Sequence, residues 1–157
     1  MNENLLKQIK EEEGLVLHAY KDHLGYLTIG YGRLIDKNKG GGITKEEAEY
    51  LLKNDIERFI NEIKKNISFF NDLNDARQAV IINMAFQMGI SGLLGFKNTL
   101  KFIENKEFDK AADNMMLSKW ATQTNNRAKR LSEQMRSGNF VFKWDYNDIN
   151  YINISKN

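Results

Sequence analysis

The sequence predicts an α+β fold that is mostly helical, in which a small lobe with a short antiparallel sheet is joined by a long helix to a helical lobe. Three observations support it. Apolar residues alternate between residues 15 and 29, which is typical of strands with one buried face. A capped helical pattern of about 20 residues follows, long enough to connect two lobes. From residue 75 onward the apolar residues recur at helical spacing.

The first expected element is a helix over residues 3–13. Leu5, Leu6 and Ile9 lie at the spacing of one helix face, which indicates an amphipathic helix. Gly14 follows directly and suits the end of a helix, because glycine adopts a left-handed backbone without steric cost. Glu13 is therefore expected as the last residue of this helix.

Two or three short antiparallel strands are expected next. One covers residues 15–19, and another covers 26–29, after a turn at 22–25 (D-H-L-G). The spaced glycines 30 and 32 weaken the second strand but allow backbone to line a cleft. Residues 37–42 are expected to form a loop because lysine, asparagine and glycine dominate them.

A capping box marks the start of the long helix. The pattern T-K-E-E at residues 44–47 lets Thr44 and Glu47 bind each other's backbone N–H, and Ile43 can pack onto Ala48. The expected helix, 45–65, carries one apolar stripe that consists of Leu51, Leu52, Ile56, Phe59, Ile60 and Ile63.

The remaining elements are expected to be helices. They cover 75–88 (ending at Gly89), 93–105, 108–117 and a last helix from Asn125 or Asn126 to Gly138. Residues 80–86 are apolar nearly all round, as in a buried central helix. Aromatic residues alternate after residue 139 (Phe140, Phe142, Trp144, Tyr146), and either an edge strand or a partly disordered extension fits this pattern.

The composition excludes several kinds of site. There is no cysteine among the 157 residues, so disulfides and thiolate metal sites are excluded. His18 and His23 are the only histidines, on an expected strand and turn, and they are poorly placed for zinc. We therefore expect neither a metal nor a cofactor. Charges interrupt the apolar residues before residue 13, so we expect neither a signal peptide nor a membrane span there, and synthesis in the cytoplasm.

Positive charge is concentrated late in the chain, although the net charge is only +2. Residues 119–143 carry six cations against Glu133 alone; the cations are Lys119, Arg127, Lys129, Arg130, Arg136 and Lys143. Such a surface suits a polyanion, for example a bacterial cell wall, an acidic membrane face or nucleic acid. A solvated helix face explains the segment equally well.

Glu13, Asp22 and Thr28 form a candidate acid/base site. Cleavage of a glycosidic bond needs a proton donor and an ionised partner that steers water or attacks the sugar. At a helix C-terminus the dipole disfavours a carboxylate, and the apolar stretch that follows desolvates it, so Glu13 is the better donor. Asp22 lies beside a turn with unpaired backbone N–H groups, and the Thr28 hydroxyl could hold a water with it. Taken singly, these are a surface acid, a turn residue and a strand former.

Four segments carry a family resemblance. The motif E-G-L-x-L-x-x-Y-x-D-x-x-G-Y-x-T-I-G-Y-G, starting at Glu13, resembles the active-site segment of the phage-type lysozymes, glycoside hydrolase family 24, especially its T-even members. The others resemble the start of that family's interlobe helix (44–49), its buried central helix and following turn (83–89, 95–100) and its late helix entry (120–130). The resemblance implies one lysozyme-like domain, 1–157, with a β lobe (14–44), an interlobe helix (45–65) and a helical lobe (1–13 with 66–157).

The resemblance also implies roles for individual residues. Glu13 would be the general acid, and Asp22 with Thr28 the water-positioning pair of an inverting muramidase. The cleft would be lined by Gln87, Gln123 and Arg127, and Arg127 would pair with Glu13, which opposes the effect of burial on that carboxyl group.

The sequence departs from the family in two places. Arg33 stands where these enzymes often carry a histidine that pairs with an aspartate on the long helix. Since Asp55 occupies the matching position, we expect an Arg33–Asp55 ion pair. The loop between Leu34 and Ile43 is much shorter than in the T-even members, which leaves one wall of the substrate groove undefined.

The leading hypothesis is an endolysin that cuts peptidoglycan between N-acetylmuramic acid and N-acetylglucosamine. We expect a monomer that binds this polysaccharide, with no nucleic acid partner and no stable membrane insertion, and that acts on the cell wall or periplasm after release from the host cytoplasm. One alternative is a non-catalytic cell-wall-binding module. Another is a membrane-lytic activity of the basic amphipathic segment 125–138.

Overall fold

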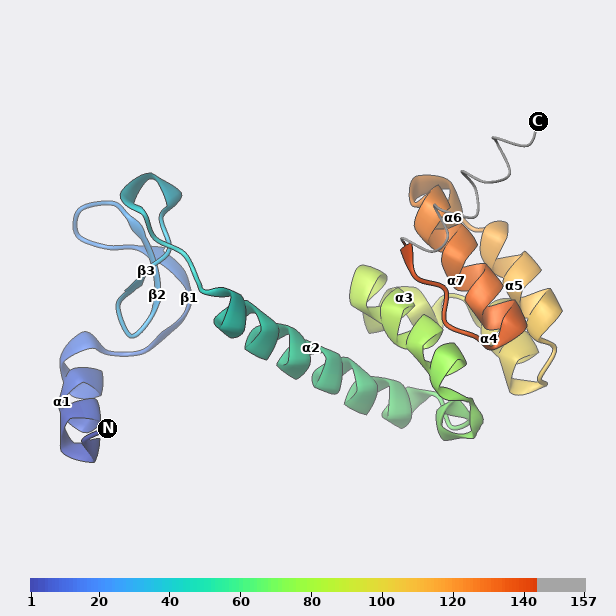
Figure 1. Cartoon of the computed structure of the whole chain (residues 1–157), viewed down its shortest axis with the longest axis horizontal. Coiled ribbons are helices and arrows are strands. Elements are labelled where there is room, and N and C mark those ends of the chain that lie inside the picture. Colours follow the sequence, from blue (N-terminus) through green and yellow to red (C-terminus); the bar gives the residue numbers. More distant parts are fainter. Residues whose placement is uncertain (144–157) are drawn as a thin grey trace. The chain divides into compact units, whose positions relative to one another are not determined.

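The computed structural model describes residues 1–143 (Figure 1). The chain divides into an N-terminal unit, Met1–Lys53, and a C-terminal unit that begins at Asn54. The described residues form seven α-helices and one three-stranded antiparallel sheet. The predicted α+β, mostly helical, lysozyme-like fold class is confirmed. Residues 1–13 fall in one unit with the sheet, whereas the family resemblance implies that they belong to the helical lobe; the lobe boundaries stay a prediction.

The N-terminal unit begins with α1 (Glu3–Glu13), which has the predicted bounds. The Asn2 side chain caps its first turn by accepting hydrogen bonds from two backbone N–H groups. At its other end the N–H of Gly14 donates to the Lys10 carbonyl, and Gly14 has a φ of 69°. These local contacts place Glu13 in the last turn, where the chain leaves the helix.

Strands β1 (Val16–Lys21), β2 (Leu27–Gly30) and β3 (Arg33–Leu34) form the sheet, in the order β1-β2-β3. Thr28 on the middle strand pairs with Tyr20 on one side and with Leu34 on the other. This register puts Thr28 at the centre of the sheet, and its side chain is only 5% exposed. Part of the expected loop after β3 forms a short 3₁₀ turn, η1 (Lys37–Lys39).

Helix α2 (Lys45–Asn66) starts with the predicted capping box. The backbone N–H of Thr44 donates to Oε2 of Glu47 over 2.8 Å, and the N–H of Glu47 donates to Oγ1 of Thr44 over 3.1 Å. The predicted apolar stripe is buried unevenly. Leu51 and Leu52 are exposed, whereas Ile63 is fully buried in the core of the C-terminal unit.

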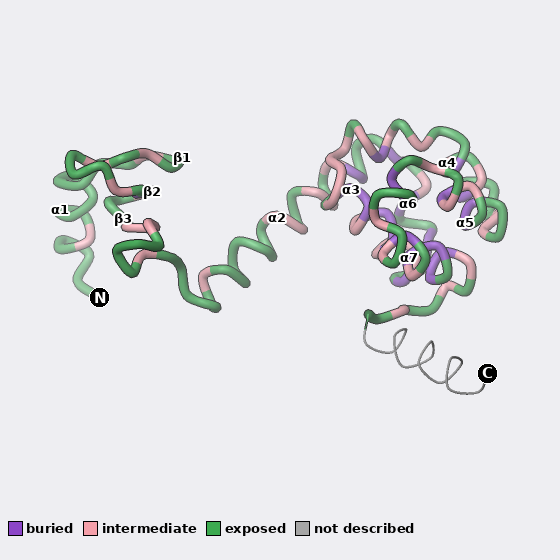
Figure 2. Tube along the Cα trace, turned by 90° about the horizontal axis from the view of Figure 1, so that it is seen from above, coloured by how far each residue is buried: buried purple, intermediate pink, exposed green. Residues whose placement is uncertain are grey.

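The C-terminal unit is helical, and Figure 2 shows that its buried residues gather among these helices. After the 3₁₀ turn η2 (Phe70–Asp72), it contains α3 (Asp75–Leu94), α4 (Lys97–Glu104), α5 (Phe108–Met116), α6 (Lys119–Gln123) and α7 (Asn125–Ser137). Val80, Ile81, Met84 and Ala85 of α3 are at most 1% exposed. The prediction of a buried central helix is therefore confirmed.

Three helices differ from the prediction: α3, α4, which begins at Lys97 and not at residue 93, and α6. Gly89 leaves the helical conformation (φ 78°, ψ 167°), but α3 resumes after this break and continues to Leu94. It continues because Leu93 enters the core, where it is 1% exposed. Helix α6 was not predicted; it is capped by Ser118, whose Oγ accepts a hydrogen bond from the N–H of Ala121 over 3.1 Å.

The end of the described chain is not a strand over residues 139–143. Phe140 and Phe142 instead stack with their ring centroids 5.8 Å apart. The other two aromatic residues of the predicted alternation, Trp144 and Tyr146, lie outside the described residues. Among the described helices, none is by itself long and apolar enough to cross a membrane; α3 and α4 pass that test only as a pair bent by 102°.

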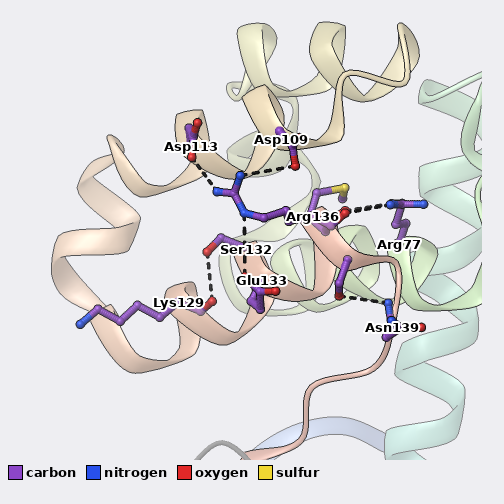
Figure 3. Close-up of polar contacts among 10 residues, drawn as sticks. Arg77, Asp109, Asp113, Lys129, Ser132, Glu133, Arg136 and Asn139 are labelled. Carbon is purple, nitrogen blue, oxygen red and sulfur yellow. Dashed lines mark hydrogen bonds and ion pairs between the residues drawn. The ribbon is translucent and has the colours of Figure 1, made fainter. Parts of the chain in front are cut away.

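Acidic residues of α5 compensate part of the basic segment 119–143 (Figure 3). The Arg136 guanidinium lies 2.6 Å from Asp113, 3.4 Å from Asp109 and 3.8 Å from Glu133. The hydrogen bond that Arg136 donates to Asp113 raises the pKa of Arg136. The sequence showed Glu133 as the only acid within this segment, because the other two come from a different helix. Arg136 is thus part of an ion-pair network and not a bare cation.

Candidate active site

One open pocket of about 640 Å³ in the N-terminal unit contains all three predicted acid/base residues. Glu13 enters its lining from the end of α1, Asp22 from the turn between β1 and β2, and Thr28 from the middle strand β2. Three different elements therefore bring two carboxylates and a hydroxyl group to one hollow. The antiparallel pairing of β1 with β2 across the turn at Asp22 brings Asp22 close to Thr28.

Glu13 is exposed at the last turn of α1, and the backbone of Gly32 closely approaches its carboxyl group. A Cβ atom on Gly32 would lie 2.6 Å from Oε2 of Glu13, which is closer than real Cβ contacts. Gly32 also has a φ of 70°, a conformation that favours glycine. The sequence indicated that glycines could line a cleft, but not that one of them makes room for the proposed acid.

The side chain of Asp22 is held by the backbone of its own turn. Its Oδ1 accepts hydrogen bonds from the N–H groups of Leu24 and Tyr26, each over 2.9 Å. A third bond, from the N–H of Asp22 to the Tyr26 carbonyl (2.9 Å), closes the turn. The N–H donors expected beside this turn are thus present, and they orient the carboxylate. No described residue donates to Oδ2, which leaves its lone pairs available to a ligand.

The hydroxyl group of Thr28 donates to the carbonyl of Tyr26 over 3.1 Å. Because its proton is used in this bond, Thr28 can act on a water only as an acceptor. Tyr26 therefore organises both members of the proposed pair: its N–H binds Asp22 and its carbonyl binds Thr28. The sequence pattern does not identify Tyr26 as part of the site, because both contacts run through its backbone.

The three other predicted binding residues lie in the C-terminal unit. Oε1 of Gln87 accepts a hydrogen bond from the indole N–H of Trp120 over 2.9 Å. Arg127 donates to the side-chain oxygen of Asn83, and burial lowers the pKa of Arg127. Gln123 is exposed at the end of α6. The substrate roles of these residues, and the pairing of Arg127 with Glu13, stay predictions.

The structure gives Arg33 a different partner from the expected Asp55. Its guanidinium binds Glu47 with two bonds, Nη1–Oε2 of 3.1 Å and Nη2–Oε1 of 2.5 Å, while Asp55 pairs with Arg58 at 2.9 Å. Glu47 and Asp55 lie about 12 Å apart along a helix, so one guanidinium cannot bind both. Glu47 is the partner of Arg33 because it lies in the first turn of α2, directly after the loop that follows β3.

The bonds to Glu47 have an electrostatic consequence. The backbone N–H of Thr44 is the main cause that holds the pKa of Glu47 below its usual value, and the hydrogen bond from Arg33 adds to it. The same carboxylate therefore serves as the helix cap and as the partner of β3. The capping box was the sequence signal that could have identified Glu47 as this partner.

Comparisons with known proteins place the chain among lysozymes. Residues 10–137 match the family model described as phage lysozyme. A probable T4-type lysozyme of Dictyostelium discoideum is 33% identical over 164 residues, which cover 88% of this chain and 96% of the relative. A peptidoglycan hydrolase of Pseudomonas phage phiKMV is 30% identical over 84% of this chain and 15% of its own length. An endolysin of Bacillus phage B103 is 31% identical over 71% of this chain and 42% of its own.

Proposed function

Because this chain belongs to the phage lysozyme family, it is a glycoside hydrolase that acts on peptidoglycan, and we propose that it is an inverting muramidase. The bond cleaved is the β-1,4 linkage between N-acetylmuramic acid and N-acetylglucosamine. The observation that carries this proposal is the pocket in which Glu13, Asp22 and Thr28 meet. Retaining and inverting glycosidases both use a pair of carboxyl groups on either side of the glycosidic bond.

In the proposed mechanism Glu13 donates its proton to the glycosidic oxygen as the bond to the anomeric carbon breaks. A water held by Asp22 and Thr28 attacks that carbon from the other face of the sugar. Asp22 accepts the proton that the water loses, and Thr28 accepts a hydrogen bond through its lone pairs. Inversion follows because the water attacks directly and no sugar becomes attached to the enzyme.

Substrate binding is assigned to Gln87, Gln123 and Arg127. These groups suit the hydroxyl and acetamido groups of an amino-sugar polymer, because an amide donates and accepts hydrogen bonds and a guanidinium donates several. The amide nitrogen of Gln87 remains available for this purpose, since Trp120 uses only the amide oxygen.

The proposal is tested with Glu13→Gln, which keeps the shape of the side chain and removes its proton. We expect the variant to lose lysis of permeabilised bacteria and the release of reducing sugars from purified walls. Glu12→Gln is the matched control, because Glu12 belongs to the same acidic run but is not part of the pocket lining. Survival of activity in Glu13→Gln would exclude Glu13 as the acid. Proton NMR of the first product should show the inverted configuration; retention would exclude direct attack by water.

The same experiment separates the alternatives. A non-catalytic wall-binding module predicts that the wild-type protein sediments with walls without releasing sugar. A membrane-lytic activity predicts killing that survives Glu13→Gln. The structure weighs against this last alternative, because the apolar residues of α7 (Ala128, Leu131 and Met135) are buried in the protein core and are not available to a lipid surface.

A further inference from the structure

The lining of the proposed catalytic pocket includes one lysine, Lys39, at the end of the 3₁₀ turn η1. Its ammonium group lies over the ring of Tyr26, 4.6 Å from the ring centroid. This is within the range of a cation–π interaction. The aromatic ring therefore positions the end of a side chain that is flexible by itself.

The loop that carries Lys39 is held in place by its own hydrogen bonds. The Asp36 side chain accepts from the N–H of Asn38 (3.0 Å) and from the N–H of Leu27 on β2 (3.3 Å). The Asp36 carbonyl accepts from the N–H of Gly41 over 2.9 Å. A Cβ atom on Gly41 would lie 2.7 Å from the nitrogen of Asp36, so the backbone packs too closely there for any side chain. The loop thus presents Lys39 from a defined position.

The charge of Lys39 is not compensated by an ion pair with any carboxylate of the described residues. The acid closest to it in the loop sequence, Asp36, binds backbone N–H groups instead. Asp22, the ionised acid of the proposed mechanism, lies in the same lining. Its negative charge repels an anionic substrate, and a cation in the lining offsets this repulsion.

We propose that Lys39, positioned by Tyr26, forms a subsite for a carboxylate carried by the muramic acid side of the substrate. This inference rests on the proposed muramidase function. Two carboxylates share the required chemistry, those of the stem peptide and that of the lactyl group once the peptide has been removed. The sequence alone left one wall of the substrate groove undefined at the short loop 35–42. In this proposal that loop forms the wall and contributes its positive charge through Lys39.

The test compares Lys39→Gln with Lys37→Gln. Both substitutions remove one positive charge from the same turn, but Lys37 is not part of the pocket lining. On intact sacculi we expect Lys39→Gln to raise the apparent KM about fivefold, the scale of one exposed ion pair, with kcat unchanged. Lys37→Gln should match the wild type, and Lys39→Arg should restore most of the affinity.

A second arm removes the charge from the substrate. The carboxylates of the sacculi are amidated with carbodiimide and methylamine. On these amidated sacculi the KM of the wild type should rise to that of Lys39→Gln, while the KM of Lys39→Gln should change little. An amidase that strips the stem peptides then distinguishes the sources. A Lys39→Gln penalty that persists on the stripped glycan, measured by sedimentation or cleavage, shows that the subsite also binds the lactyl carboxylate that the amidase frees, and a penalty that disappears assigns the stem peptide alone.

Two results would overturn the subsite. One is an equal KM for the wild type and Lys39→Gln on intact sacculi that both proteins cleave. The other is an undiminished penalty of Lys39→Gln on amidated sacculi. Failure of the muramidase function itself has a different signature, since the wild type and Lys37→Gln would then release no reducing sugar from any of these substrates.

Discussion

Gly32 and Glu13 are in such close contact that a methyl group on the glycine would lie 2.6 Å from Oε2 of the glutamate. The missing side chain of Gly32 thus determines where the carboxyl group of the proposed acid can lie. Since the clash is with the end of a flexible side chain, a larger residue would displace the carboxyl group rather than the backbone. Catalysis is sensitive to such a shift, because proton transfer requires hydrogen-bond distance to the leaving oxygen.

We expect Gly32→Ala to lower kcat by about tenfold or more, because displacement of a catalytic group by about 1 Å is costly. Gly30→Ala is the control. Gly30 has nearly the same φ, 69° against 70°, but nothing lies within 4 Å of its Cβ position. Both variants therefore carry similar backbone strain, and only Gly32→Ala displaces Glu13. Equal kcat values in the two variants would show that the contact has no catalytic role.

Asp22→Asn should separate the charge of this residue from its place in the turn. The asparagine oxygen can still accept the two backbone bonds from Leu24 and Tyr26, so thermal unfolding should stay near that of the wild type. We expect wall lysis to fall by about 100-fold or more, the usual contribution of an acid/base group. Asp22→Ala loses the bonds as well and should have a lower Tm. A fully active Asp22→Asn would mean that another group activates the water.

Gln87→Leu should destabilise the protein through Trp120. The indole N–H, on a residue that is 8% exposed, would lose its acceptor on Gln87. An unpaired buried donor costs about 1–3 kcal/mol of unfolding free energy, measurable by urea denaturation. Gln87→Glu retains an acceptor oxygen and should cost less. Similar losses in both variants would rule out this bond as the cause.

Glu47 should contribute stability that depends on pH. Its pKa is lowered below the usual 4.5 in the folded protein, so its stabilising effect is fully present above about pH 4.5 and is lost as the pH falls through the lowered pKa. We expect the difference in unfolding free energy between the wild type and Glu47→Gln to shrink as the pH falls below about 4.5. The glutamine still caps α2, so the comparison isolates the charge. A difference in unfolding free energy that is independent of pH would contradict this assignment. Asp55→Asn is the control, and it should leave the pH dependence that arises from Glu47 unchanged.

Contacts between residues close in sequence were predictable. The bounds of α1 and the start of α2 follow from caps and capping boxes, such as Thr44 with Glu47, whose partners lie within one turn. The strands before and after the turn at Asp22 follow from alternation of apolar residues. The resemblance to a family singled out Glu13, Asp22 and Thr28, and the structure adds that they line one pocket.

Contacts between distant residues were decided only by the tertiary structure. Arg33 had several acids available along one helix, and the structure pairs it with Glu47, while Asp55 pairs with Arg58. Arg136 found two of its carboxylates, Asp109 and Asp113, on another helix. Gly32 meets Glu13 from 19 positions away. The physical reason is the same in each case: periodicity and capping act within a few residues, whereas the partner of a long side chain depends on which elements pack together.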